Sequence, residues 1–279
     1  MARQNIFDLI TQRTDIEREI NHIIRLFEEE KTITAGYNYS RRQLTIREFL
    51  DVGPFAGWVG RGHSIDLDEF LELLEYDDLQ NQALHSECAF TTLMEIVYNL
   101  WCGADDAREE FSSVEVGNNF FLLQRILVDC ISQFNLRLVH DKKNAQYILI
   151  EDRPEVTAVA EIVDDALAFD VLWYNHRTLK GNLKEKKRIL FSLGQNLEIN
   201  RKQLQVINTQ LTDAIFTILN NMGIRHNNPH NEEVLANLTQ GELEEWYDEL
   251  YQMMLLAKLE LDNIERMNKY KTDLKPKLI

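Results

Sequence analysis

The chain has 279 residues, of which 44% are hydrophobic and 27% are charged, with 11 Gly and 4 Pro. That length suits one large domain or two of ordinary size, and the composition excludes collagen-like, low-complexity and turn-rich all-β chains. No segment approaches the roughly 18 apolar residues of a membrane helix, and the N-terminus lacks the apolar region of a signal peptide. Three cysteines without a CxxC pair indicate neither a disulfide framework nor a zinc ribbon. These features favour a reduced, cytoplasmic protein that is not bound to a membrane.

The acidic residues are concentrated in one part of the chain. The whole sequence has 30 Lys+Arg against 46 Asp+Glu, a formal net charge of -16. Residues 51–110 contain 14 acidic residues and only Arg61 and Arg108 as bases, so this segment carries -12. Such a stretch is typical of a solvated face, and it also suits a docking surface for a basic partner.

The first half is expected to be mainly helical. Residues 13–30 have apolar side chains at helical spacing, and a short helix is expected at residues 45–50. The glycines of residues 57–62 indicate a loop, but no GK[ST] follows, which argues against phosphate binding. Ser64 is the expected N-cap of a helix that runs through Glu75. Residues 86–101 and 115–134 predict two further helices.

One segment of this mainly helical half is expected to form β-strands. Residues 136–140 and 146–150 predict a β-hairpin around the polar loop 141–145. Because a lone hairpin is marginal, it is expected to pack on helices. The domain boundary is expected just before Pro154, which suits the first turn of a helix. We therefore predict a helical N-terminal domain with a hairpin at residues 1–152 and a helical bundle at residues 153–279.

The second half predicts an antiparallel bundle of four amphipathic helices. The first is expected at residues 156–179, and Asn182 with Glu185 is typical of a capping box for the second. The third has an apolar stripe from Leu204 to Met222, and Thr239 with Glu242 predicts the start of a long final helix. The predicted fold class is mostly α, with this bundle after a helical N-terminal domain.

The loop between the last two predicted helices is the densest polar cluster of the bundle. It places Arg225, His226, Asn227 and His230 within six residues, with Pro229 stiffening the turn. An imidazole can take the 2′-hydroxyl proton of RNA or protonate the leaving 5′-oxygen, because its pKa lies near neutral pH. A guanidinium can hold the scissile phosphate and stabilise its developing charge. Two copies across a two-fold axis would supply both an acid and a base.

Arg225, four residues and then His230 resembles the R-x(4–6)-H signature of the HEPN superfamily (higher eukaryote and prokaryote nucleotide-binding), in which a polar residue such as His226 follows the arginine. The resemblance covers about residues 154–270, and the front half looks like the N-terminal domains of J-type abortive-infection members. It implies a metal-independent endoribonuclease, without a cofactor, that dimerises and leaves a 2′,3′-cyclic phosphate. It further implies a toxin or phage-defence effector with Arg225 and His230 as catalytic residues, assisted by His226 or Asn227. The sequence departs from the family's toxin pattern R-x4-H-x-Y, because no Tyr follows His230 by two residues.

Several alternatives remain open at this point. Arg225 could cap helix carbonyls while His230 binds backbone, or the chain could be an inactive relative that binds a partner or nucleotide. The rival class is a non-enzymatic interaction protein that uses the acidic residues 51–110. For the enzyme, RNA is the expected substrate, and an antitoxin or regulatory protein is a further candidate partner. The candidate RNA contacts, which are equally typical of a solvated helix face, are Lys184, Lys187, Arg188, Arg201 and Lys202.

Overall fold

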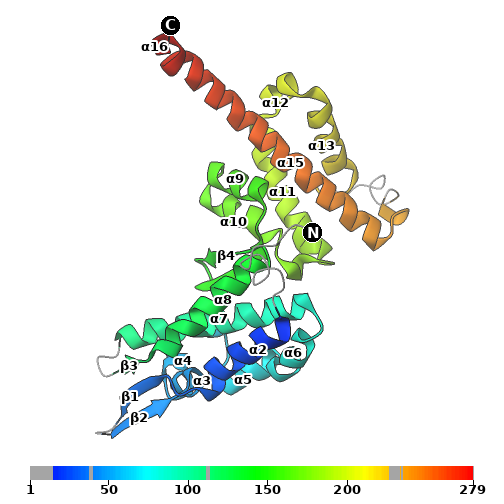
Figure 1. Ribbon diagram of the computed structural model, residues 1–279. Helices are drawn as coiled ribbons and strands as arrows, with labels where there is room; N and C mark the ends of the chain where they lie inside the picture. The colour runs from blue at the N-terminus through cyan, green and yellow to red at the C-terminus, as the bar shows by residue number, and fades with distance from the viewer. Residues whose placement is uncertain (1–14, 38–39, 111–113, 226–232, 234, 279) are drawn as a thin grey trace, which may run out of the picture. The chain divides into compact units, whose positions relative to one another are not determined.

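The computed structural model describes residues 15–37, 40–110, 114–225, 233 and 235–278. These residues are mostly helical, with a few short antiparallel strands (Figure 1). The chain divides into two compact units, one ending at Glu151 and the other beginning at Asp152, and each unit has a buried apolar core. No helix in the described ranges is both long and apolar enough to cross a membrane.

In its described residues, the first unit combines helices of 4 to 24 residues with five strands. Its helical elements are α2 (Ile16–Ile24), the π-helical turn η1 (Arg25–Glu29), α3 (Ile46–Asp51), α4 (Pro54–Gly57), the 3-10 turn η2 (Val59–Arg61), α5 (Leu67–Leu73), α6 (Tyr76–Ala83), α7 (Glu87–Glu110) and α8 (Asn118–Gln133). Its strands are β1 (Ile33–Tyr37), β2 (Ser40–Leu44), β3 (Val114–Val116), β4 (Leu136–Asp141) and β5 (Gln146–Glu151).

Helix α7 is the centre of the first unit, because it contacts α3, α4, α6, α8, β3 and β5. Its buried side chains recur at spacings of three and four residues, the period of a helix face turned to a core. The helix continues for nine residues beyond Trp101, where it was expected to end. Trp101 is buried and donates its indole N–H to the carbonyl of Phe120 at 3.0 Å, so α8 is fixed against α7.

A three-stranded antiparallel sheet of order β2-β1-β3 is the main difference from the expected elements of this unit. In register, Ile33 pairs with Leu44 on one side and with Val116 on the other. Strand β3 lies where a helix was expected to begin at residue 115, and α8 starts three residues later. The helix after the glycine-rich loop also differs, since Asp66 rather than Ser64 accepts the hydrogen bond from its first turn.

The predicted hairpin is confirmed, with β4 and β5 paired from Leu136↔Glu151 to Asp141↔Gln146. Asp141 is therefore part of the strand, and the loop contains four residues rather than five. Helix α7 supplies polar partners for β5: the Asn99 amide exchanges two hydrogen bonds of 2.7 Å with the backbone of Tyr147, and the Glu95 carboxylate accepts from the N–H of Leu149 at 2.6 Å. These bonds satisfy strand-edge groups that a lone hairpin leaves open.

The glycine-rich segment makes room for an aromatic ring. A methyl group added at Gly60 would lie 2.5 Å from Cε2 of Trp58, and one added at Gly103 of α7 would lie 3.3 Å from the same indole. Trp58 thus packs against Gly60, where an added methyl would clash with the ring, and closely against Gly103, where the ring would have to shift slightly. The loop is tied to the hairpin through Gln146, whose amide donates to the carbonyl of Gly60 at 2.6 Å. Packing of Trp58 therefore accounts for Gly60, and the left-handed φ of 62° accounts for Gly62.

Replacing Gly60 with alanine is therefore expected to destabilise the protein by about 1–3 kcal/mol, because the new methyl must displace the Trp58 ring. Urea unfolding followed by tryptophan fluorescence measures this loss. Gly57→Ala is the matched control, because an added methyl at Gly57 meets nothing within 4 Å. Equal stability of the two variants would show that Trp58 can move away without cost.

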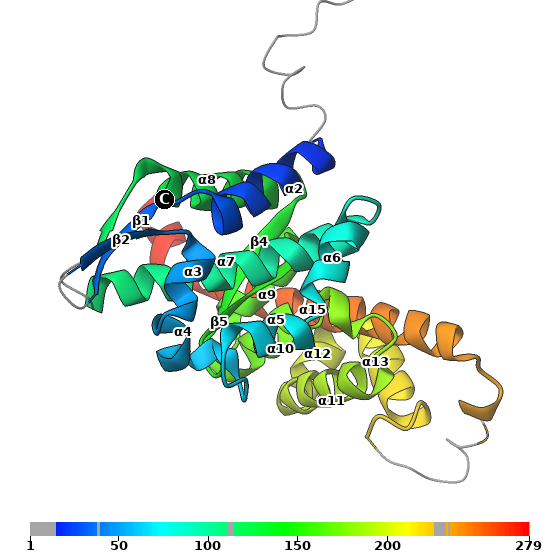
Figure 2. The same cartoon turned by 90° about the horizontal axis from the view of Figure 1, so that it is seen from below.

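The second unit is entirely helical in its described part. Its elements are α9 (Pro154–Ile162), α10 (Asp165–Trp173), the 3-10 turn η3 (Arg177–Leu179), α11 (Leu183–Ile199), α12 (Arg201–Ile207), α13 (Thr209–Asn221), α15 (Gln240–Lys269), the π-helical turn η4 (Tyr270–Leu274) and α16 (Lys275–Leu278). Helices α9, α11, α12 and α13 all contact the long helix α15 (Figure 1, Figure 2). The predicted capping box at Thr239 is confirmed, since both of its hydrogen bonds are present.

Two of the expected long helices are broken. The helix expected at residues 156–179 divides at Val163, which is extended, and Asp164 then caps α10 by accepting from the N–H of Leu167 at 3.0 Å. The apolar stripe expected from Leu204 to Met222 divides at Asn208, which caps α13 in the same way. Apolar spacing continues across both breaks, whereas short polar side chains that bind their own backbone favour a new helix start.

Candidate functional site

The polar loop begins where α13 ends. Gly223 has φ 64°, the left-handed conformation that terminates many helices, and Ile224 is buried. The backbone N–H of Arg225 donates to the carbonyl of Leu219 at 3.1 Å, which ties the start of the loop to the last turns of α13. His226, Asn227 and His230 lie outside the described residues, so their roles stay predictions.

Arg225 is held by an acidic side chain from another helix. Its Nη1 lies 2.9 Å from Oε2 of Glu198, in the last turn of α11. Its guanidinium carbon also lies 5.8 Å from the ring centre of Phe216, a buried residue of α13. The Arg225 side chain remains 21% exposed, so it reaches solvent while two other segments fix its position.

Arg201 shares both of these partners. Its Nη1 lies 3.3 Å from Oε1 of Glu198, and its guanidinium carbon lies 4.2 Å from the centre of the Phe216 ring. We call Glu198, Arg201, Phe216 and Arg225 the arginine cluster. With two guanidinium groups and one carboxylate, the cluster has a net charge of +1. Its members come from α11, α12, α13 and the residue that begins the loop, so only the folded unit brings them together.

The other candidate RNA contacts are spread along the unit. Lys184, Lys187 and Arg188 lie on the first turns of α11, whereas Arg201 follows the end of this helix, and 17 helical residues span about 25 Å. Arg188 is occupied by three hydrogen bonds, two to Asp170 and one to Glu185, which raise the pKa of its guanidinium. Lys202 is exposed beside Arg201. Only Arg201 of the five contacts the same residues as Arg225.

Sequence reasoning missed a polar network in the second core. Lys186, with a side chain only 6% exposed, lies 2.7 Å from Glu244 and 2.7 Å from Asp248 of α15. The hydroxyl of Tyr174 donates to the same Asp248 carboxylate at 2.9 Å. Burial and this neighbouring carboxylate raise the pKa of Tyr174. Helical spacing could have predicted this burial, because Lys186 lies on the same helix face as the apolar residues Leu190, Leu193 and Leu197, and this face packs in the core.

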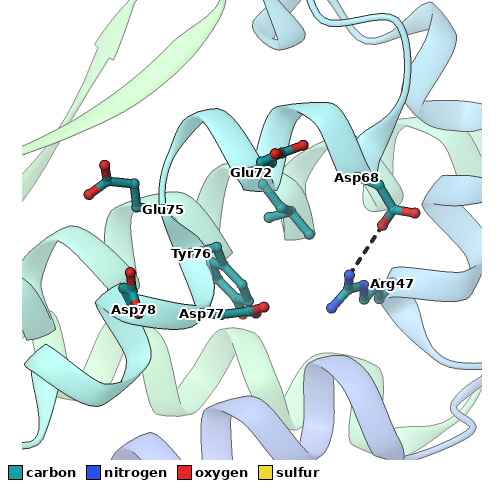
Figure 3. Close-up of a pocket in the computed structure, with 8 residues that line it drawn as sticks. Arg47, Asp68, Glu72, Glu75, Tyr76, Asp77 and Asp78 are labelled. Carbon is teal, nitrogen blue, oxygen red and sulfur yellow. Dashed lines mark hydrogen bonds and ion pairs between the residues drawn. The ribbon is translucent and has the colours of Figure 1, made fainter.

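The acidic segment forms a cavity in the first unit. Its volume is 490 Å³, and Asp68, Glu72, Glu75, Asp77 and Asp78 line it together with Arg47, Leu71 and Tyr76 (Figure 3). Arg47 lies 3.2 Å from Asp68 and 3.6 Å from Glu28, so its charge is already neutralised. Glu75 has φ 49° and turns the chain from α5 into α6, which places acidic residues of both helices around the cavity.

Two of the cysteines are poor nucleophiles. Burial raises the pKa of the Cys102 thiol to about 12 and that of Cys130 to about 12. Both thiols therefore remain protonated at neutral pH, whereas nucleophilic attack requires the thiolate. Among the residues whose placement is described, no three His, Cys, Asp or Glu side chains form a group that could hold a metal ion.

Comparisons with protein-family models, curated proteins and solved structures return no match to this chain.

Proposed function

We propose that the protein is a metal-independent endoribonuclease of HEPN type that acts as a toxin or phage-defence effector. In this proposal, Arg225 binds the scissile phosphate, and His230 transfers the proton needed for attack by the 2′-hydroxyl. His226 or Asn227 assists, and the product is a 2′,3′-cyclic phosphate. A homodimer would bring two such loops together, so that one His230 acts as base and the other as acid.

The observation that carries this proposal is the fixed position of Arg225. A merely capping arginine would turn back to the carbonyls of its own helix. The Arg225 guanidinium instead reaches Glu198 of α11 and Phe216, and it stays partly open to solvent at the first residue of the histidine loop. A guanidinium held in this way can stabilise charge on a phosphate without first being ordered.

The test is cleavage of total tRNA and mRNA by the purified full chain in the presence of EDTA. Cutting that persists in EDTA and leaves 2′,3′-cyclic phosphate ends supports the proposal, because attack by the 2′-hydroxyl needs no metal. Wild-type protein that leaves all RNA intact, or that cuts only with added divalent metal, overturns it.

A second candidate function is binding of a basic partner in the acidic cavity. It is favoured by the cavity's lining, in which Glu72, Glu75, Asp77 and Asp78 make no ion pair among the residues that the structure describes. Carboxylates of this kind attract lysine-rich segments, most strongly at low ionic strength.

For this second function, the double variant Glu72→Gln, Asp78→Asn is expected to weaken binding of a fluorescent lysine-rich peptide about tenfold, since two charges leave the cavity. Fluorescence anisotropy measures the change. Glu115→Gln with Asp129→Asn removes the same charge from exposed sites of the first unit that do not line the cavity. If both double variants weaken binding equally, the peptide senses only net charge and the cavity is not a site.

A further inference from the structure

The arginine cluster holds one carboxylate between two guanidinium groups. Glu198 offers Oε2 to Arg225 at 2.9 Å and Oε1 to Arg201 at 3.3 Å, so each oxygen has its own arginine. The two arginines are 24 positions apart in the sequence and enter from different segments. The carboxylate therefore lies at the point where their positive potentials overlap.

Carboxylate and phosphate groups are interchangeable partners for guanidinium. Both present two acceptor oxygens with a spacing that matches the N–H donors of arginine. The geometry that accommodates Oε1 and Oε2 of Glu198 thus also suits two oxygens of a phosphodiester. The side chains of Glu198, Arg201 and Arg225 are 37%, 42% and 21% exposed, so an external anion can reach them.

Phe216 gives the two guanidinium groups a support that does not depend on Glu198. Its ring is buried, and both arginine side chains lie against it, at 4.2 Å for Arg201 and 5.8 Å for Arg225. A cation over an aromatic face is stabilised by the ring itself. The two arginines can therefore keep their places if the carboxylate of Glu198 moves away.

We propose that Arg201 and Arg225 together form a phosphate-binding subsite for the RNA backbone, and that Glu198 occupies this subsite as an internal competitor when no RNA is bound. The assignment of RNA as the ligand rests on the proposed function. An incoming phosphodiester exchanges with the Glu198 carboxylate, which turns towards solvent. In this proposal, Arg201 binds the same phosphate as Arg225, and Glu198 lowers the affinity of the protein for RNA.

The test measures binding of the full-length protein to a fluorescent 2′-O-methyl RNA of about a dozen nucleotides, a length comparable to the site sizes of single-strand binding proteins. This probe cannot be cut by 2′-hydroxyl attack, so binding is measured whether or not the wild type is a nuclease. Glu198→Gln keeps the shape and removes the charge, and it is expected to tighten binding about fivefold, the equivalent of one partly exposed ion pair. Arg201→Gln is expected to weaken binding and to lower the dependence of affinity on salt by about one ion.

Matched controls come from α15, where Asp262 pairs with Arg266 on the helix surface. Asp262→Asn and Arg266→Gln make the same changes of charge outside the cluster and are expected to leave affinity within about twofold. The double variant Glu198→Gln, Arg201→Gln is expected to lose the gain of the single variant. If Glu198→Gln binds no more tightly than Asp262→Asn, or if no variant binds the probe at low salt, the proposed subsite is wrong. If the variants bind the probe in this order of affinity but the wild type does not cleave RNA, the nuclease function is wrong and the phosphate-binding subsite stands.

Discussion

Replacing His230 with alanine is expected to lower the rate of RNA cleavage by the purified protein at least about a hundredfold, the usual contribution of a positioned general acid or base. Arg225→Ala is expected to lower it by a similar factor, because the charge that develops on the phosphate loses its guanidinium partner. Arg225→Lys keeps the charge but not the paired donors, and should recover only a small part of the rate. The measurement is single-turnover cleavage of a labelled RNA with EDTA present.

The control for these variants is His63→Ala, which removes an exposed histidine of the first unit and should cleave at the wild-type rate. Because Arg225 is held by Glu198, unfolding curves of Arg225→Ala should be recorded alongside its activity. His230→Ala protein that is folded and fully active would contradict the catalytic assignment. If Arg225→Ala loses activity but His230→Ala does not, Arg225 contributes to cleavage but His230 is not its catalytic partner.

Replacing the buried lysine of the second unit is expected to destabilise the protein. Lys186→Met keeps the length and the apolar stem but leaves Glu244 and Asp248 without their cation. Removing one partner of a fully buried ion pair costs about 3–5 kcal/mol. Asp248 is half exposed and Glu244 about one fifth exposed, so water solvates them in part and we expect about 2 kcal/mol. Urea unfolding at neutral pH measures the loss.

Lys184→Met is the matched control, two residues earlier on the same helix at an exposed position, and is expected to change stability by less than about 0.5 kcal/mol. Equal stability of the two methionine variants would show that the apolar contacts of position 186 outweigh its charge.

The contribution of this ion pair should also depend on pH. The hydrogen bond from Lys186, followed by that from the backbone N–H of Gly181, lowers the pKa of Glu244. A carboxyl group with a lowered pKa in the folded state stabilises the protein above its unfolded pKa of about 4.3, and this stabilisation is lost as the pH falls through the folded value. The difference between wild type and Lys186→Met should therefore shrink between pH 7 and pH 3. A difference that stays constant over this range would exclude Glu244 as its source.

Local signals in the sequence were enough for several elements of the fold. The hairpin followed from two apolar segments around a polar turn, and the start of α15 followed from Thr239 and Glu242. Both patterns lie within about 16 consecutive residues, so they can be recognised without knowledge of the tertiary structure. The breaks at Asp164 and Asn208 also had local signals, but the continuous apolar spacing on either side concealed them.

The three-stranded sheet had no comparable local signal. Strand β1 contains a glycine, and β2 is mostly polar. Strand β3, which pairs with β1, lies about 80 residues after it in the chain. A strand of this kind is stabilised by its partner rather than by its own propensity. The pairing of β1 with β3 joins distant segments, so patterns within a short stretch of sequence could not predict it.

For the candidate site, the residue types could be read from the sequence: one arginine, two histidines and three asparagines lie in one loop after the helix that Gly223 ends. The environment of Arg225 could not be read in this way, because Glu198 lies 27 residues away and Arg201 and Phe216 belong to separate helices that come together only on folding. The tertiary structure likewise decided that Lys186 is a core cation and that five acidic residues of α5, α6 and their junction face one cavity. Charge and hydrogen-bonding capacity are properties of single residues, whereas burial and ion pairing arise only when distant segments pack together.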